Sequence, residues 1–182
     1  MQFPVGIQKG SLAIGFYAPR SHDIIDMDKC YIHYPVNDKI ISIVRDYINK
    51  FHIPPYNEQS HEGIIRHIVS RTGFKSGEIM VVIVTNGDEL PYKRELIKSL
   101  TENIPQIKSI VQNINSKRTN VILGSENKVL WGKDHIDDYI GDLKFKISPL
   151  SFFQVNPVQT EILYKIAVDY AGLTGRETVI DA

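Results

Sequence analysis

A single thiol is the first candidate for covalent chemistry in this chain. Cys30 is the only cysteine among the 182 residues. Asp26 and Asp28 lie close before it, and acidic neighbours disfavour the thiolate form that attacks substrates. We therefore do not expect Cys30 to be a nucleophile, and a free, buried or half-exposed side chain is the commonest role of a lone cysteine. Because one cysteine cannot form an internal disulfide, we expect a reducing compartment, the cytoplasm.

The six histidines do not form a pattern typical of a metal site. His61 and His67 are six positions apart, and His22 and His33 are eleven positions apart. Neither spacing is that of a zinc-binding motif. The residues themselves therefore predict no metal site.

Basic side chains gather near a pair of predicted strands and after a later strand; they are Arg66, His67, Arg71, Lys75, Lys117 and Arg118. Such residues could contact RNA phosphates. A charge cluster is more often a solvated face, and the 21 basic residues are balanced by 21 acidic ones. Binding of nucleic acid by bulk charge is therefore disfavoured.

The predicted helices and strands that carry these side chains follow an alternating order in the first two thirds of the chain. The patterns predict a hairpin within residues 6–17 that turns near Gln8–Gly10, a helix from Asp38 capped by Asn37 and ended by Pro54–Pro55, strands over residues 63–70 and 78–85, a helix after Pro91, and a strand over residues 107–114. This β-α-β-β-α-β order predicts an α+β fold with a mainly antiparallel sheet and two covering helices, similar to a split βαβ sandwich.

The pattern changes after Asn115. Short strands are predicted over residues 120–124 and 128–132, a hairpin over 139–147, and a strand over 177–182. Between the last two lies a helix that Asn156 caps, with Pro157 in its first turn, Gln159 placed for a capping box and Gly172 as its stop. Its apolar face would contain Ile162, Leu163, Ile166, Ala167 and Tyr170. Because the final strand has no partner after it, we expect a longer enzyme cut at the start of its catalytic domain.

The composition excludes some classes of protein. About 42% of the residues are hydrophobic and 23% are charged, so global disorder is excluded. No apolar run approaches the ~20 residues that a membrane span needs. The first residues lack the basic start and long apolar stretch of a signal peptide.

One segment carries a specific family resemblance. Residues 147–164, ISPLSFFQVNPVQTEILY, resemble the S-P-x-S-F-F-Q-V-N-x-x-Q-x-E-x-L-Y signature of the RNA uracil-5-methyltransferases that modify bacterial 23S rRNA and tRNA. Residues 2–6, 15–17, 21–26, 120–124, 171–175 and 179–182, together with Cys30, are also similar to that family. The resemblance covers essentially the whole chain and is closest to the Gram-positive branch that methylates 23S rRNA.

The resemblance implies a domain organisation. Members of the family are longer and carry a β-barrel RNA-binding domain, an iron–sulfur segment, a central domain and a Rossmann-type methyltransferase domain. Residues 1–145 resemble the central α/β domain, and residues 146–182 resemble the linker and the truncated start of the S-adenosylmethionine-dependent catalytic domain. The partner implied is RNA, with neither DNA nor a membrane.

The resemblance also implies a mechanism and site residues. A cysteine thiolate adds at C6 of uracil, C5 then attacks the methyl group of S-adenosylmethionine, and a base removes the C5 proton. By resemblance, Gln154 contacts S-adenosylmethionine, and its amide can both donate and accept hydrogen bonds. Cys30 matches the isolated fourth ligand of a 4Fe-4S cluster whose other ligands would precede Met1. The catalytic cysteine, the base and the glycine-rich cofactor loop would follow Ala182, so we expect these 182 residues alone to be inactive and to hold no cluster.

Several alternatives stay open at this point. Gln154 could merely satisfy backbone groups ahead of the helix cap. Phe152 and Phe153 could stack on a base or fill a core. The chain could also be a non-enzymatic RNA-binding or interaction module, or part of a tRNA-directed member of the same family.

Overall fold

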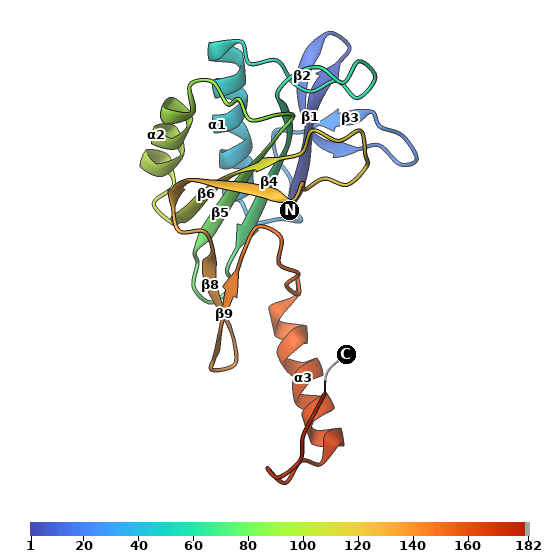
Figure 1. Ribbon diagram of the computed structural model, residues 1–182, viewed down its shortest axis with the longest axis vertical. Coiled ribbons are helices and arrows are strands. Elements are labelled where there is room, and N and C mark those ends of the chain that lie inside the picture. The colour runs from blue at the N-terminus through green and yellow to red at the C-terminus, as the bar shows by residue number, and fades with distance from the viewer. Residues whose placement is uncertain (181–182) are drawn as a thin grey trace.

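The computed structural model describes residues 1–180 (Figure 1). The elements of this part of the chain are β1 (Gln2–Gln8), β2 (Ser11–Tyr17), β3 (Ile24–Asp26), α1 (Val36–Phe51), β4 (Ile65–Thr72), β5 (Ile79–Thr85), α2 (Lys93–Asn103), β6 (Ile107–Ile114), β7 (Glu126–Gly132), β8 (Ile136–Ile140), β9 (Leu143–Ile147) and α3 (Pro157–Ala171). None of these helices is long and apolar enough to cross a lipid bilayer.

Seven strands form one sheet in the order β3-β2-β1-β4-β5-β6-β7, and β8 and β9 form a separate hairpin. Within the described residues only β5 and β6 run parallel, and α2 connects them. The predicted α+β class, with a mainly antiparallel sheet and two covering helices, is confirmed. The pairing differs in one respect from a split βαβ unit, because no strand separates β5 from β6.

The hairpin of β1 and β2 forms as its sequence predicts. Gln8 pairs with Ser11, so the loop contains only Lys9 and Gly10. Both loop residues have positive φ angles, 51° and 82°. Two-residue hairpin loops favour such angles because the resulting twist matches that of the strands, and glycine adopts them without strain.

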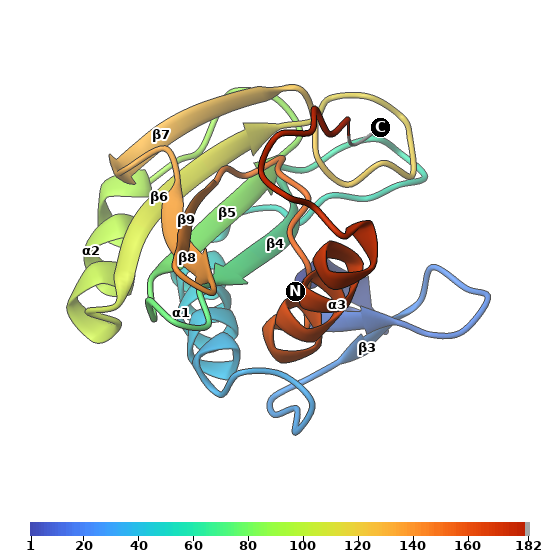
Figure 2. The ribbon, with the colours of Figure 1, turned by 90° about the horizontal axis from the view of Figure 1, so that it is seen from below.

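The main core lies between one face of the sheet and helices α1 and α2. The helices contribute residues spaced three and four apart, including Ile40, Val44, Leu96 and Leu100, which are all fully buried. Every residue of β5 is buried, because the opposite face of that strand is covered as well. Figure 2 shows β8 and β9 on that opposite side, where Ile136 and Ile147 pack against Val82 and Val111.

Two sequence expectations about α1 and its surroundings are wrong. The helix begins at Val36 with Pro35 at the N-cap position, and Asn37 is a buried residue of the first turn instead of a cap. The helix ends at Phe51, before Pro54–Pro55, because His52 turns into the left-handed conformation with a φ of 51°. Backbone geometry thus ends this helix two residues before the position that precedes Pro54.

The strand predicted over residues 120–124 does not form. The side-chain amide of Asn115 donates to the carbonyls of Val121 and Ile122, and that of Asn113 donates to the carbonyl of Gly124. These contacts hold the segment as a loop, since asparagine side chains compete with a strand for backbone groups. Residues 177–180 of the predicted final strand are also irregular, and residues 181–182 lie outside the described part.

Helix α3 begins and ends at the predicted residues, but within residues 1–180 the side chain of Gln159 does not complete the predicted capping box. The side chain of Asn156 accepts a hydrogen bond from the Gln159 backbone N–H at 3.1 Å, and Gly172 ends the helix with a φ of 57°. The preceding hairpin starts at Ile136, three residues earlier than expected, and the domain boundary expected after residue 145 falls within β9. Figure 1 shows α3 projecting away from the sheet.

Candidate functional site

The candidate site is the loop that joins β9 to α3, residues 148–156, which includes Gln154. Gln154 is half-buried in this loop. Because Asn156 makes the helix cap, the cap does not need the amide of Gln154. The contact of Gln154 with S-adenosylmethionine, which the resemblance implies, stays a prediction.

The two phenylalanines of the loop have different environments. Phe153 packs against the core below β5, with its ring 5.8 Å from that of Phe145. Phe152 is 85% exposed. The core alternative is therefore correct for Phe153, whereas the ring of Phe152 is open to stacking on a base.

A buried carboxylate fixes the hairpin that precedes this loop. Asp138 of β8 is 1% exposed and accepts hydrogen bonds from three successive backbone N–H groups in the turn between β4 and β5. The distances are 2.9 Å from Phe74, 2.9 Å from Lys75 and 3.2 Å from Ser76. Successive N–H groups in such a turn form a concave binding site for an anion, so the turn holds the hairpin by its carboxylate.

Gly73 lies where the β4–β5 turn approaches the β8–β9 hairpin closely, and the space there suits a residue without a side chain. A Cβ atom there would lie 2.2 Å from the Ser76 hydroxyl and 3.0 Å from the Asp137 carbonyl. A side chain would therefore force the turn and the hairpin apart.

The loop is also anchored at both of its ends. At the β9 end, the Arg71 guanidinium donates to the Pro149 carbonyl at 2.8 Å. At the α3 end, Glu161 forms an ion pair with Lys75 at 2.6 Å and accepts from the Gly141 N–H at 2.8 Å. Lys75, followed by this N–H group, lowers the pKa of Glu161 below its usual value.

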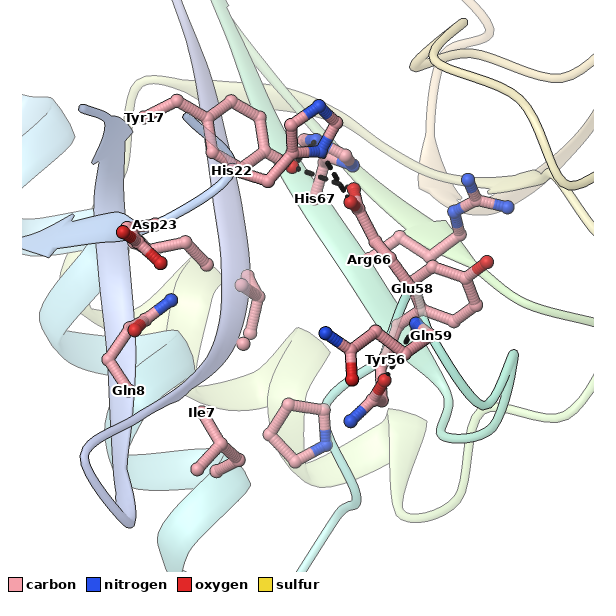
Figure 3. Close-up of a pocket in the computed structure, with 15 residues that line it drawn as sticks. Ile7, Gln8, Tyr17, His22, Asp23, Tyr56, Glu58, Gln59, Arg66 and His67 are labelled. Atoms are coloured by element: carbon pink, nitrogen blue, oxygen red, sulfur yellow. Dashed lines mark hydrogen bonds and ion pairs between the residues drawn. The ribbon is translucent and has the colours of Figure 1, made fainter. Parts of the chain in front are cut away.

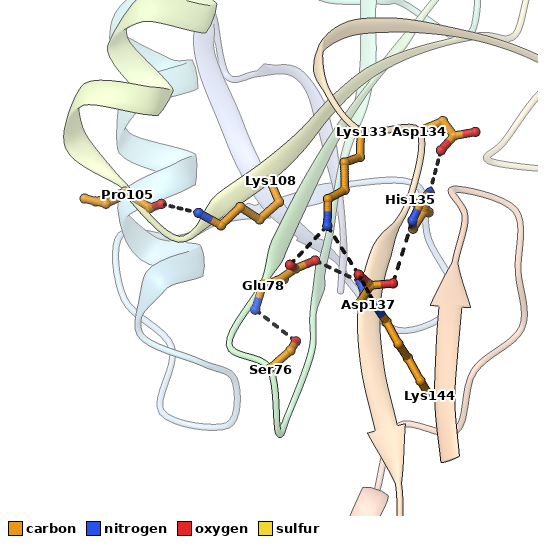
Figure 4. A network of polar contacts seen from close by, with 9 residues as sticks. All are labelled: Ser76, Glu78, Pro105, Lys108, Lys133, Asp134, His135, Asp137 and Lys144. Carbon is orange, nitrogen blue, oxygen red and sulfur yellow. Dashed lines mark hydrogen bonds and ion pairs between the residues drawn. The ribbon is translucent and has the colours of Figure 1, made fainter. Parts of the chain in front are cut away.

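A second polar network links the base of the hairpin to the sheet (Figure 4). The Asp137 carboxylate lies 3.0 Å from the ammonium of Lys144 and 3.3 Å from that of Lys133. Lys144, and then Lys133, lowers the pKa of Asp137. Glu78 accepts from the Asp137 backbone N–H at 2.9 Å and pairs with Lys133 at 3.4 Å. Two adjacent residues of β8, Asp137 and Asp138, thus hold the hairpin on its two opposite faces.

The apolar residues predicted for α3 do not pack into a core. Ile162, Leu163 and Ile166 are 48%, 58% and 44% exposed, and Tyr170 is 88% exposed. The predicted apolar face is not distinct, because Val158, Tyr164 and Val168 outside it are also exposed, and within residues 1–180 all of these side chains are open to solvent. Helices with an apolar stripe normally bury it against another element.

Cys30 lies in the loop between β3 and α1. Its side chain is partly exposed, and its backbone N–H donates to the carboxylate of Asp38 at 3.2 Å. The next residues, Tyr31 and Ile32, are 87% and 86% exposed. An iron–sulfur cluster needs about four thiolates, so the residues of this chain do not form a cluster site by themselves.

The predicted basic cluster is a solvated face only in part. Arg66 is 4% exposed and donates to the carbonyls of Asn115, Lys117 and Thr119. His67 is also buried. Since Arg71 and Lys75 anchor the candidate loop, these four side chains are not free for phosphates. Lys117 and Arg118 are exposed.

Sequence reasoning missed Asp138 and Glu161. Asp138 is separated by 62 to 64 positions from the N–H groups it binds. The residues next to Asp138 in the sequence give no indication of so distant a contact. Only the docking of the hairpin on the turn makes it a structural residue.

The sequence is similar to proteins named RNA methyltransferases. No protein-family model matches the sequence. A protein of Clostridium tetani, named an uncharacterized RNA methyltransferase, is 56% identical over 182 residues, which cover 100% of this chain and 40% of that protein. A protein of Halalkalibacterium halodurans with a similar name is 55% identical over 181 residues, with 100% and 40% coverage. The chain thus spans about 40% of the length of these relatives.

A solved structure extends the comparison. The tRNA (uracil-54, C5)-methyltransferase of Pyrococcus abyssi, in complex with S-adenosyl-L-homocysteine, is 26% identical and superposes with a TM-score of 0.74. The match covers 92% of this chain and 39% of that protein. The chain is a homologue of RNA methyltransferases. The resemblance to the uracil-5-methyltransferase family is confirmed, and the matched part of the Pyrococcus abyssi protein shares the fold described above.

Proposed function

We propose that this chain is part of an S-adenosylmethionine-dependent RNA methyltransferase that forms 5-methyluridine in 23S rRNA. This proposal rests on the similarity of the whole chain to RNA methyltransferases and of most of it to one that acts on uracil C5. The 23S rRNA target follows from the resemblance to the Gram-positive branch. A tRNA target is the second candidate, because the protein in the matched structure acts on tRNA.

We propose that Gln154 binds S-adenosylmethionine and that Phe152 stacks on a base of the RNA. The amide of Gln154 is free of the helix cap, and the exposed ring of Phe152 lies in the same loop. S-adenosylmethionine supplies the methyl group when bound. The contribution of this chain is to hold the loop, through Asp138, Arg71 and Glu161, so that little ordering is needed when cofactor and RNA arrive.

The remaining chemistry is proposed to come from outside these residues. The reaction needs a thiolate and a base, and the only thiol here lies beside two aspartates. We propose that residues 1–145 form the central domain, that residues 146–182 lead into the catalytic domain, and that the 182 residues alone do not transfer methyl groups. We place the reaction in the cytoplasm, where a free thiol persists.

We further propose that Cys30 supplies one thiolate of a 4Fe-4S cluster whose other ligands lie elsewhere in the full-length protein. The partial exposure of Cys30, beside two exposed apolar residues, leaves it accessible to another segment. In the full-length protein purified without oxygen, Cys30→Ser should lower the iron content and remove the visible absorption of the cluster. Unchanged iron content would contradict this ligand.

The target is tested with the full-length gene product, S-adenosylmethionine, and separate 23S rRNA and tRNA transcripts. Nucleoside mass spectrometry should find 5-methyluridine in the 23S rRNA. Methylation of tRNA alone would favour the second candidate, and methylation of neither would contradict the proposal.

The role of Gln154 is tested by calorimetric binding of S-adenosylmethionine. Loss of one hydrogen-bonding amide, in Gln154→Ala, should weaken binding about tenfold, which corresponds to about 1.4 kcal/mol. Gln159→Ala is a matched control, because Gln159 is exposed and only its backbone N–H contacts the cap. Equal affinities of the two variants would contradict the role of Gln154.

A further inference from the structure

The sheet opens between β1 and β4 and forms a cavity of about 360 Å³ (Figure 3). Pro4 and His67 are the last paired residues of these two strands. Beyond that pair β1 continues to Gln8 while paired only with β2. Residues 55–59 form the facing wall of the cavity. A volume of this size is in the range that binds small organic ligands.

A connected set of polar side chains lies at one end of the cavity. Glu58 accepts from the Tyr17 hydroxyl at 3.2 Å and contacts His22 Nδ1 at 2.5 Å. The Tyr17 hydroxyl also lies 3.5 Å from His67 Nε2. Each carboxylate oxygen of Glu58 has one contact and can accept a second hydrogen bond. The carboxylate is therefore held in place and still able to bind a donor.

Buried polar atoms in the wall of the cavity lack partners. His67 is 6% exposed, and within residues 1–180 its Nδ1 atom has no hydrogen-bond partner. Burial, and then the charge of Arg66, lowers the pKa of His67 to about 4, so the ring is neutral near pH 7. Burial and the nearby Glu58 raise the pKa of Tyr17 to about 12, so its hydroxyl stays protonated. The walls that His67 and Tyr17 give to the cavity are therefore uncharged near pH 7.

The backbone of β1 adds further hydrogen-bonding groups. In an antiparallel hairpin, alternate residues direct their N–H and C=O groups toward the partner strand and away from it. Gln8 and Ser11 close the two-residue loop, so the backbone groups of Ile7 face away from β2, toward the cavity. The cavity thus offers both donors and acceptors along one edge.

Four cationic side chains lie close in sequence to residues that line the cavity or contact its wall. Lys9 follows Gln8, and Arg20 precedes His22 by two residues. Lys117 and Arg118 belong to the segment that receives the hydrogen bonds of Arg66. All four are exposed, and none forms an ion pair with another residue of the described range. Exposed and unpaired cations of this kind are available to RNA phosphates.

We propose that this cavity binds an unstacked base of the RNA, and that it selects a base with amino hydrogens, guanine above all. This inference rests on the proposed action on RNA. Single-stranded RNA is recognised by bases that leave the stack and form hydrogen bonds through their edges. Guanine presents two adjacent donors to a carboxylate such as Glu58, whereas uracil presents mainly carbonyl acceptors. The cavity is therefore a specificity site separate from the loop that contains Gln154.

Other ligands fit less well. The carboxylate of Glu58 would repel a phosphate inside the cavity. Within residues 1–180 no three histidine, cysteine or acidic side chains are grouped to hold a metal ion.

The test compares two heptaribonucleotides, one of uridines only and one with a central guanosine, binding to the full-length gene product. We expect fluorescence anisotropy to show at least about fivefold tighter binding of the guanosine heptamer, the lower limit for a bidentate base contact. Glu58→Gln keeps the length of the side chain but replaces one acceptor oxygen with a donor, and should abolish the preference. Glu102→Gln is the matched control, because Glu102 is an exposed residue of α2. Equal binding of the two heptamers by the wild type, or an unchanged preference in Glu58→Gln, would overturn the inference.

A second measurement does not depend on the variant. Titration with the guanosine heptamer should shift the NMR signals of the His22 and His67 rings, and titration with the uridine heptamer should shift them much less. Equal shifts, or none, would overturn the inference. Methyl transfer is assayed separately, so active enzyme without base preference contradicts only this inference, and inactive enzyme contradicts the proposed function.

Discussion

Replacement of Asp138 by asparagine tests how the hairpin and the candidate loop are held. The carboxylate accepts from the Phe74 N–H with one oxygen, and from the N–H groups of Lys75 and Ser76 with the other. An asparagine amide oxygen can keep the second pair of bonds. Its NH2 group then faces the Phe74 N–H, so one bond is lost and two donors oppose each other.

The magnitude follows from these three contacts. A hydrogen bond to a charged group contributes about 1.5–3 kcal/mol, and a buried donor left without a partner costs about 1–3 kcal/mol. We expect Asp138→Asn to lower the free energy of unfolding by about 3 kcal/mol. With a urea dependence of about 2–3 kcal/mol/M, the midpoint should fall by about 1 M.

The assay is urea unfolding followed by circular dichroism, with Asp142→Asn as the matched control. Asp142 lies in the turn of the same hairpin and is exposed. Its substitution should change stability by less than about 0.5 kcal/mol. If the two variants unfold at the same urea concentration, the carboxylate of Asp138 does not hold the hairpin and the reasoning is refuted.

Three further predictions concern the buried polar residues. Arg66→Met removes three hydrogen bonds to carbonyls and the stacking on Tyr56. It should lower the free energy of unfolding, measured in urea, by about 3–5 kcal/mol. A change below about 1 kcal/mol would show that these carbonyls find other partners. The side-chain amide of Asn113 donates to the Gly124 carbonyl and accepts from the Gly124 N–H, and Asn113→Ala removes both hydrogen bonds. Amide hydrogen exchange in the loop over residues 120–124 should therefore accelerate at least about tenfold. Unchanged exchange would contradict the role of Asn113. The pKa of His67 is about 4 when folded against 6.5 when unfolded, so the unfolded chain binds more protons between these values and stability falls as the pH drops from 6.5 to 4. The wild type should therefore lose up to about 3 kcal/mol more over this range than His67→Gln, and parallel pH profiles would show that His67 is not buried as a neutral ring.

Local sequence patterns predicted most of the scaffold. The turn at Lys9–Gly10, the β-branched strand β5 and the Asn156 cap each depend on neighbours within a few residues. The loop over residues 120–124 was missed because its apolar residues favour a strand, while the decisive contacts come from Asn113 and Asn115. Side-chain competition of this kind is set by the tertiary structure.

The candidate site was predictable only in part. The loop with Gln154 was found through its similarity to a family signature. The groups that hold this loop were not found, because Asp138 and Glu161 meet their partners only after the hairpin docks. Arg66 and His67 were expected on a solvated face but are buried. The sequence could not show this, because an alternating pattern is the same for a side chain covered by a loop and for an exposed one.

Release of tritium from C5 of uracil distinguishes methylation of this carbon from methylation of any other atom of the RNA. RNA transcripts with tritium at C5 of their uridines are incubated with the full-length gene product and S-adenosylmethionine. Because the new methyl group replaces the C5 hydrogen, we expect one tritium released to water for each methyl group incorporated. Incorporation of methyl groups without release of tritium would place the modification on another atom and contradict the proposed function.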